Sequence, residues 1–454
     1  MPKASGSRGS PPAPHTALAR TPHPGRAQDD YYYEPIVRTK AAFRWIFALY
    51  YPQRTTLEHG PTAILPSYHT HSVLSSCDPS LAEEKARPFV CEAGSVALIH
   101  FDSWHRATEQ SEGVRHMLKF HFVRMQEPHV HGPSWGVSST AKDTNASADW
   151  RQSPAAAATY EWLCGRDALA EPAADLHPSE AVQTILEGDE EARVTAALRA
   201  GAAAADGASD ELIAACLDWL RSAEGQETAE AIVAAGGVFG TAEREGAPRR
   251  AKACNPAGTN PADMDVTHAL IAAGSASVPL MLEALRNDAE PWAVLASAAA
   301  VLGNVRVEAA DVEAVSLALA HCAAPGRHRW VRRNSVEALG IVAQTLAGHA
   351  RAKVAATLTA TLAGQGQDEG GADGDEDDDE EEQDQYGSEE TVMTTAALSI
   401  ARLADGWRCH SLSCAASALA AVQEGEADHR LAGTMRHYAA HALARVNGEA
   451  PHVL

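Results

Sequence analysis

The residues best suited to chemistry lie between positions 100 and 115, in the stretch HFDSWHRATEQSEGVR. His105 and Arg115 are ten residues apart, a spacing that suits one antiparallel hairpin turning at residues 109–113. Imidazole nitrogens are common ligands of transition metals, and a guanidinium can match a carboxylate with two parallel hydrogen bonds. His100 and Asp102 add a second histidine and a carboxylate. The stretch therefore offers metal and carboxylate chemistry, provided that strands hold its side chains together.

Two further histidine pairs have the spacing of metal ligands, but neither has a third ligand at a fixed offset. They lie in SYHTHSV and PHVHGP, as His69 with His71 and His129 with His131. We interpret both pairs as polar loop residues.

The elements that must position these side chains are strands. From Phe43 onward the chain is rich in aromatic and β-branched residues, in FRWIFALYYP, EHGPTAILP, FVCEAGSVALIH and VRHMLKFHFVRM. Gly-Pro and Pro separate the apolar runs, as they do between strands. We expect a β domain within residues 31–150.

Two phrases in this region, FALYYPQRTTLEHGPTAILPSYH and EAGSVALIHFDSWHRATEQSEGVRHMLKFHFVRM, resemble the C-terminal half of the phytanoyl-CoA dioxygenase-like family. The resemblance covers about a fifth of the chain, and some members of that family also carry helical repeats downstream. It implies a partial double-stranded β-helix of the jelly-roll or cupin type. It also implies Fe(II) and 2-oxoglutarate as cofactors and a small-molecule substrate that the sequence does not identify.

The family holds Fe(II) with two histidines and one carboxylate and binds the far carboxylate of 2-oxoglutarate with an arginine. By resemblance, His105 occupies the position of the distal metal ligand, and Arg115 that of the cofactor anchor. The remaining His-x-Asp pair lies on an early strand in the family. His100 and Asp102 spell that motif but belong to the same run as His105, so we do not assign them.

The position where the pair should fall is HPGRAQDDYYY, at residues 23–33, which contains no His-x-Asp. His23 and Asp30, with Asp29 beside it, are the weak candidates that remain. The helices and first strands of the family also have no counterpart before Phe43. Two explanations stay open: a truncated or mis-spliced oxygenase, or a β segment that has lost its metal chemistry.

Past Trp150 the pattern becomes helical, and we expect HEAT-like or armadillo-like repeats over residues 160–454. Ala dominates, and apolar residues recur at intervals of three and four. Four segments can be superposed, VLASAAAVLGNV, VRRNSVEALGIV, VMTTAALSIARL and MRHYAAHALARV, which begin at Val294, Val331, Val392 and Met435. Their period of about 40 residues, after an acidic insertion is removed, is typical of an α-helical solenoid. The predicted fold class is therefore α+β and multidomain.

The acidic insertion accounts for most of the net charge. Residues 368–390 contain fourteen carboxylates and no Lys or Arg, so the rest of the chain carries −9 of the formal −23. No long basic face is visible, which argues against a nucleic-acid partner. The Ala-rich stretches are interrupted by charges, so no membrane span is expected.

The eight cysteines include no CxxC pair, which is typical of free thiols in a reducing compartment. We therefore expect an intracellular, cytoplasmic protein. Residues 1–30 are rich in proline and nearly free of acidic side chains, as disordered tails and organelle-targeting peptides both are. Organelle targeting is thus an alternative to the cytoplasm.

Two functions follow. The first is an Fe(II)/2-oxoglutarate-dependent dioxygenase, or a relic of one with an incomplete iron site. The second is a scaffold without catalytic activity, in which the helical repeats present a surface to a protein partner. Iron and 2-oxoglutarate binding separates the two.

We predict that the acidic segment 365–390 is disordered and outside the helical core, because like charges at this density repel and cannot be buried. Its deletion should leave the melting temperature of the helical region nearly unchanged, as measured by circular dichroism. A fall of many degrees would contradict this placement.

Overall fold

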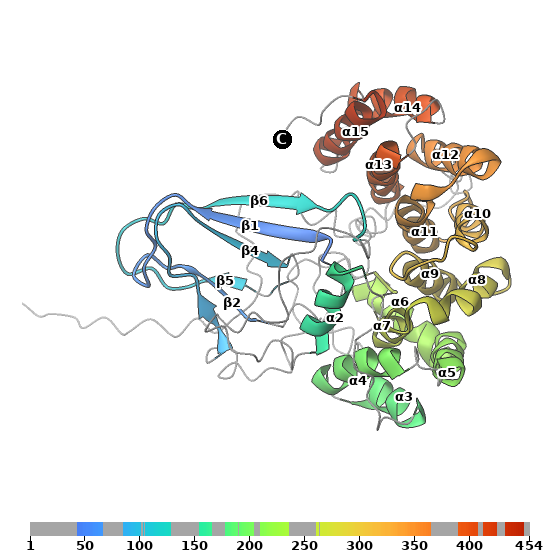
Figure 1. Cartoon of the computed structure of the whole chain (residues 1–454), viewed down its shortest axis with the longest axis horizontal. Helices are drawn as coiled ribbons and strands as arrows, with labels where there is room; N and C mark the ends of the chain where they lie inside the picture. Colours follow the sequence, from blue (N-terminus) through green and yellow to red (C-terminus); the bar gives the residue numbers. More distant parts are fainter. Residues whose placement is uncertain are drawn as a thin grey trace, which may run out of the picture.

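The computed structural model describes residues 43–66, 85–100, 103, 105–128, 154–165, 178–188, 190–203, 209–235, 260–262, 264–364, 389–406, 412–424 and 432–448. Two small antiparallel sheets precede a mostly helical region, so the fold class is α+β (Figure 1). The expected tail at residues 1–30 lies outside the described residues, as does the acidic segment except for Glu389 and Glu390. These two residues are helical and begin α13.

The described strands form two three-stranded sheets, in the orders β4-β1-β6 and β3-β2-β5. All pairings are antiparallel. The strands span β1 (Trp45–Tyr51), β2 (Thr62–Ile64), β3 (Arg87–Pro88), β4 (Ser95–His100), β5 (His105–Ala107) and β6 (Leu118–Val123). Every apolar run that the sequence marked as a strand contributes at least one of them.

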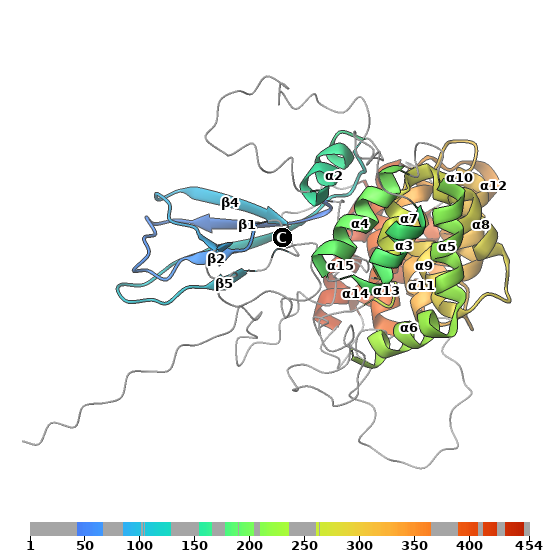
Figure 2. The same cartoon turned by 90° about the horizontal axis from the view of Figure 1, so that it is seen from below.

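The two sheets lie one above the other and project to one side of the helices (Figures 1 and 2). Side chains alternate between the faces of a strand, and Phe47, Leu49 and Tyr51 of β1 are buried on the same face. They pack with Ile99 of β4 and with Ile64 of β2, which belongs to the other sheet. The core of the β segment therefore lies between the two sheets.

The expected hairpin between His105 and Arg115 is wrong. β5 pairs with β2, whereas β6 pairs with β1 in the other sheet. The chain therefore crosses from one sheet to the other within residues 108–117. His100 and His105 likewise belong to different strands, β4 and β5, because the chain also changes sheets between them.

The helices form two rows (Figure 1). The row on the side of the sheets contains α4 (Glu190–Ala203), α7 (Asp265–Ala272), α9 (Trp292–Leu302), α11 (Arg329–Val342), α13 (Glu389–Gly406) and α15 (Ala432–Val446). The outer row contains α3 (Pro178–Glu187), α5 (Ser209–Arg221), α8 (Val278–Arg286), α10 (Val312–Cys322), α12 (Gly348–Leu362) and α14 (Ser413–Glu424). The remaining elements are α2 (Pro154–Leu163), α6 (Ala223–Ala235), η6 (Gly274–Ser277) and η7 (Ala343–Thr345).

The four superposed sequence segments are α9, α11, α13 and α15, and each packs against the next. The residues four positions after each segment start, Ala298, Ser335, Ala396 and Ala439, are all fully buried. The sequence register of the repeat also predicts that Leu339 of α11 lies on the buried face between neighbouring helices, and it is fully buried. The sequence repeat therefore corresponds to one row of helices, with small side chains at the contacts.

Close approach between neighbouring helices explains a glycine in the middle of α11. A Cβ atom at Gly340 would lie 2.8 Å from the Cα atom of Ser399 on α13, closer than real Cβ contacts allow. The same proximity lets the Ser399 hydroxyl donate a 2.8 Å hydrogen bond to the carbonyl oxygen of Val336. Glycine inside a helix lowers stability by about 1 kcal/mol relative to alanine. The close contact with α13 requires glycine here despite that cost.

The sequence register of the repeat predicts that Arg332 and Arg333 face solvent. This prediction is wrong, because they are only 4% and 3% exposed. α11 packs between α9 and α13 and against α10, so little of its surface remains free. The Arg333 guanidinium lies 5.0 Å from the ring centre of Trp330, an arrangement that stabilises a cation away from bulk water.

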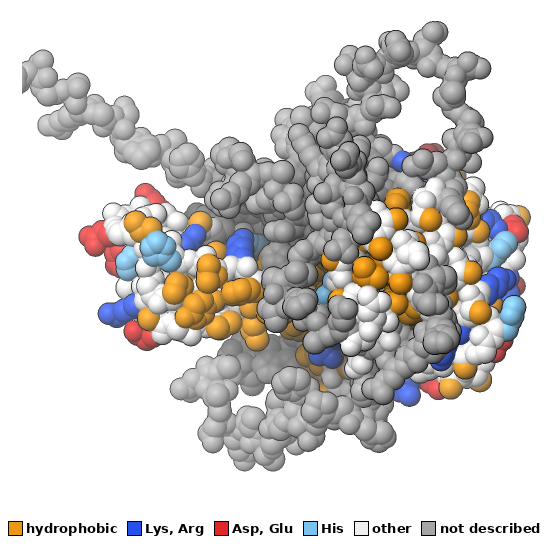
Figure 3. Space-filling view, turned by 90° about the horizontal axis from the view of Figure 1, so that it is seen from above, with side chains coloured by type: hydrophobic (Ala, Val, Ile, Leu, Met, Phe, Trp, Pro, Cys, Tyr) orange, Lys and Arg blue, Asp and Glu red, His pale blue; other side chains and the backbone are white. Residues whose placement is uncertain are grey.

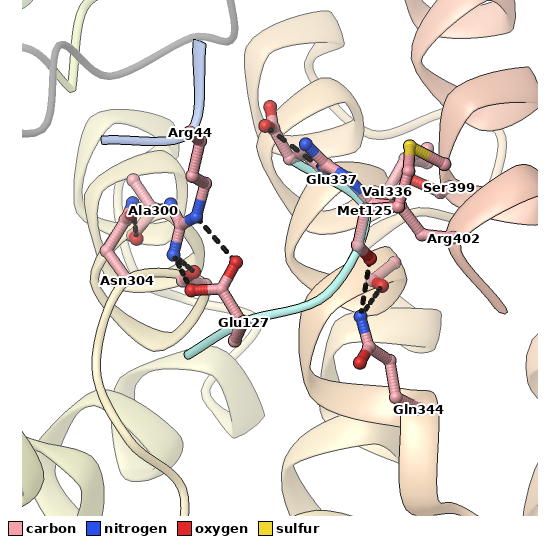
Figure 4. A network of polar contacts seen from close by, with 12 residues as sticks. Arg44, Met125, Glu127, Ala300, Asn304, Val336, Glu337, Gln344, Ser399 and Arg402 are labelled. Atoms are coloured by element: carbon pink, nitrogen blue, oxygen red, sulfur yellow. Dashed lines mark hydrogen bonds and ion pairs between the residues drawn. The ribbon is translucent and has the colours of Figure 1, made fainter. Parts of the chain in front are cut away.

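A buried arginine joins the β segment to the helices (Figure 4). Arg44, just before β1, donates to both carboxylate oxygens of Glu127, which follows β6, at 2.8 and 3.0 Å. It also donates to the carbonyl oxygen of Gly303, at 3.1 Å, and to the side-chain oxygen of Asn304. Gly303 ends α9, and a cation is favourable at the negative end of a helix dipole.

The contact continues along the neighbouring helices. Gln344 donates to the backbone carbonyl of Met125 at 3.4 Å, and Leu398 of α13 packs into the core of the sheets. On α2, the Trp162 ring lies 5.8 Å from the Arg44 guanidinium and 5.5 Å from that of Arg124. The β4-β1-β6 sheet is therefore held at one end, where β1 begins and β6 ends.

None of the helices that the structure describes is by itself long and apolar enough to cross a membrane. One bent pair, Asp265–Ala272 with Gly274–Arg286, would pass by length and composition.

We predict that Leu339→Ala lowers the free energy of unfolding by about 2 to 5 kcal/mol, because it leaves a cavity between helices in addition to the lost transfer energy. Leu57→Ala is the matched control, since Leu57 is 58% exposed and its truncation should change stability by no more than about 0.5 kcal/mol. Thermal unfolding followed at 222 nm measures both. Equal effects of the two variants would contradict the packing of α11.

We also predict that Arg44→Ala destabilises the docked β segment by about 2 to 3 kcal/mol. This is below the roughly 3 to 5 kcal/mol for a fully buried pair, because Glu127 remains 29% exposed. Hydrogen exchange should accelerate in β1 and β6 but not in α10. Arg54→Ala is the control, since its pair with Glu92 is 70% and 79% exposed and should contribute at most about 1 kcal/mol. Uniform acceleration throughout the helices would contradict a local docking role.

Candidate functional site

The candidate site lies between the two sheets, where His105 and Arg115 face the same way. His105 opens β5 and pairs with Ile64 of β2. Arg115 contacts Thr62, two residues before Ile64 on the same face of β2. Two residues along a strand correspond to roughly 7 Å. The predicted metal ligand and the predicted carboxylate anchor are thus neighbours on one inner face, although they belong to no common hairpin.

His105 is oriented by its own turn. Its Nδ1 atom lies 2.9 Å from the carbonyl oxygen of Ser103, and the ring edge faces the Phe47 ring at a centroid distance of 5.6 Å. A carbonyl oxygen only accepts, so Nδ1 carries the proton and the lone pair of a neutral ring is on Nε2. Metal-binding histidines are commonly oriented by such a bond to a backbone carbonyl.

Arg115 is held by the turn that leads into β2. Its Nη1 group donates to the carbonyl oxygen of Gly60, and lies 3.5 Å from the Thr62 hydroxyl. Gly60 has a φ of +66°, and a Cβ atom there would lie 2.8 Å from the carbonyl oxygen of Thr108. Gly60, in the EHGPTAILP phrase, is therefore needed for the turn whose carbonyl oxygen accepts the hydrogen bond from Arg115.

Two hydroxyl groups lie beside Arg115, and sequence reasoning assigned neither. Tyr51, at the end of β1, is completely buried, and Thr62 is 3% exposed. Burial raises the pKa of the Tyr51 hydroxyl, and the neighbouring Thr62 and Arg115 offset part of that rise. Tyr51 therefore remains a neutral hydroxyl at pH 7. Its place at the end of an apolar strand is the only sequence signal that could have singled it out.

A second cation lies near His105. The Lys119 ammonium group of β6 is 5.6 Å from the centre of the Phe47 ring, the ring that His105 also contacts. Arg115 thus borders one part of the space between the sheets, and Lys119 and His105 border the neighbouring part. The two cations, Arg115 and Lys119, favour an anionic ligand.

The other proposed metal ligands do not join this site. His100 lies on the opposite face of β4 from the buried Ile99, with its ring centre 5.2 Å from that of Phe43. Among the described residues, no group of three His, Cys, Asp or Glu side chains could hold a metal ion. His23, Asp29, Asp30 and Asp102 lie outside the described residues, as do His69, His71, His129 and His131.

A second cluster of charges, at the junction with the helices, is structural. The Glu337 carboxylate lies 3.5 Å from Arg402, both are buried, and Arg44 and Arg333 act on the same carboxylate. Burial raises the pKa of Glu337, and the three arginines oppose that rise. This cluster contains more cations than carboxylates, and it connects residues of the β segment with α11 and α13.

Comparisons with known proteins give no relatives: no protein-family model, curated protein or solved structure matches the chain.

Proposed function

We propose that the β segment binds a small dicarboxylic acid of the 2-oxo acid class at Arg115. The observation that carries the proposal is the shared inner face of Arg115, Thr62 and His105 between two sheets. It agrees with the resemblance to the phytanoyl-CoA dioxygenase-like family, whose cofactor is 2-oxoglutarate. In this proposal the two sheets are part of a double-stranded β-helix.

The geometry of Arg115 suits one carboxylate. Its hydrogen bonds to Gly60 and Thr62 use Nη1 alone, so the Nη2 and Nε edge is available for two parallel bonds to a carboxylate. The hydroxyls of Thr62 and Tyr51 can donate to the same oxygens. A dicarboxylate bound here would extend toward the Lys119 ammonium group, which can bind its second charged end.

The described residues do not fit an iron ion, since no group of three His, Cys, Asp or Glu side chains among them could hold one, and His105 is the only predicted ligand that they place between the sheets. A single imidazole holds Fe(II) weakly, because affinity comes from several ligands preset in one geometry. The proposed activity is therefore carboxylate binding. Oxygenase turnover would require His23 together with Asp29 or Asp30 to complete the ligand set.

The second candidate function is a protein-binding scaffold, and the repeated packing of the helices favours it. Equivalent buried positions recur on successive helices of one row, as in HEAT or armadillo repeats, which form solenoids with extended binding surfaces. We propose that the two rows are such a solenoid. In this alternative the β segment caps one side of the rows and binds no cofactor.

We predict that 2-oxoglutarate binds the full chain and that Arg115→Ala weakens binding by about tenfold or more, as expected for the loss of a charged hydrogen-bonding partner. Anaerobic calorimetric titration with 2-oxoglutarate measures this. Arg54→Ala is the control, since Arg54 is an exposed arginine of the same segment. If 2-oxoglutarate does not bind, or binds both variants equally, the site assignment is wrong and the scaffold function remains.

For the metal we predict weak binding of Mn(II), used as a stable substitute for Fe(II), and little change in His105→Ala. Titration of Mn(II) before 2-oxoglutarate tests this. Micromolar affinity that disappears in His105→Ala would show that the ligand set is complete and that residues outside the described ranges contribute to it. Micromolar affinity that does not depend on His105 would remove His105 from the site.

A further inference from the structure

The outer face of the β4-β1-β6 sheet is apolar over three strands. The register of the sheet places its outward residues in three rows across the strands: His100, Ile46 and Phe122; then Leu98, Ala48 and Phe120; then Val96, Tyr50 and Leu118. None of the nine is an acid, a lysine or an arginine. The opposite face forms the buried core, so this sheet is hydrophobic on both sides.

The large side chains of this outer face are exposed: Val96 55%, Leu98 66%, Leu118 53%, Phe120 44% and Phe122 54%. Figure 3 shows the corresponding hydrophobic patch on the sheets. These five residues expose on the order of 500 Å² of surface, taking roughly 150 to 250 Å² for a fully exposed large side chain. A patch of this size on a soluble protein commonly marks an interaction site.

We propose that this face packs against the same face of a second copy of the chain, forming a two-fold symmetric sandwich of sheets. Two observations favour a second copy. The first is size: two such faces together would bury roughly 1,000 Å², the lower limit for a specific interface. That limit is reached only when the partner covers the whole face.

The second observation is the width of the face. Three strands span about 14 Å, whereas a helix is about 10 to 12 Å across including its side chains and touches a sheet along a narrow line. A helix centred on β1 would leave much of the outer columns, on β4 and β6, in contact with water. A second three-stranded sheet covers all three columns at once, at the usual spacing of about 10 Å between packed sheets.

Symmetry permits the same arrangement. A two-fold axis that lies in the interface and runs across the strands places the outer face of each copy on that of the other, with the strands of the two copies antiparallel. A two-fold contact uses the same patch on both copies and closes at a dimer.

The placement of the helices permits this contact. The sheets project away from the two rows of helices (Figures 1 and 2), so antiparallel packing of two copies places their helices at opposite ends of the sandwich. The face carries no ionised side chains that select a charged partner, and the chain's net charge of −23 disfavours an anionic membrane surface.

Analytical ultracentrifugation of the full chain over a range of concentrations tests the proposal. We expect a dimer, and we expect Phe120→Asp to raise its dissociation constant at least about tenfold, as for a central aromatic contact. Leu57→Asp is the matched control, because Leu57 is 58% exposed but lies in a turn outside the sheet. The dimer should persist in 0.5 M NaCl, since its contacts are apolar. Unchanged circular dichroism shows that Phe120→Asp still folds.

A photo-crosslinking amino acid at position 122, in a mixture of ¹⁴N-labelled and ¹⁵N-labelled chains, provides a measurement that needs no destabilising variant. We expect crosslinks between copies that map to Trp45–Tyr51, Ser95–His100 or Leu118–Val123. A monomer at all concentrations, crosslinks only within one copy, or crosslinks to the helices of the second copy would each overturn the proposal. None of these results depends on 2-oxoglutarate binding, so the two proposals fail separately.

Discussion

The position of the β segment depends on one buried guanidinium. Arg44 has partners in two parts of the chain. Its hydrogen bonds to Glu127 connect the start of β1 with the chain after β6, and its hydrogen bonds to Gly303 and Asn304 attach this end of the sheet to the end of α9. Because the carbonyl groups at the end of a helix lack partners within the helix, the arginine satisfies atoms that would otherwise need water. The same residue therefore connects β1 with the chain after β6 and orients the sheet on the helices. The polar side chains between the sheets are positioned in turn by their packing against β1.

Charge burial at this junction has a cost that apolar packing would avoid. Replacing buried ion pairs with apolar residues is often neutral or stabilising, so Glu337 and Arg402 are weak evidence for added stability. Their effect is on specificity, because Arg44, Arg333 and Arg402 come from three elements, so the charge of Glu337 is compensated only where α11, α13 and the β segment meet. An apolar contact alone, such as that of Leu398 with the sheet core, would tolerate a shift along the helix.

The polar lining is oriented by backbone atoms. His105 is held through Nδ1, and Arg115 is held through Nη1, which leaves the other edge of the guanidinium for a ligand. The backbone carbonyls that hold them belong to two turns, at Ser103 and Gly60. This combination of rigid support and remaining donor capacity is what a ligand site requires. The outward side chains of β1 are apolar. The same strand therefore has the candidate polar site on one side and the proposed contact surface on the other.

The sequence by itself determined the local order of this protein: strands before residue 150, helices after it, the repeat that became α9, α11, α13 and α15, and the burial of Leu339. Those features follow from periodicity and composition, which act within one element. Tertiary structure alone decided that β5 and β6 belong to different sheets, and that Tyr51 and Thr62 join His105 and Arg115. It also decided that Arg332 and Arg333 are buried, since a charged side chain on one helix is exposed or covered according to what packs against it. Strand pairing and helix docking join residues distant in the chain, and their energies depend on partners that no local pattern specifies.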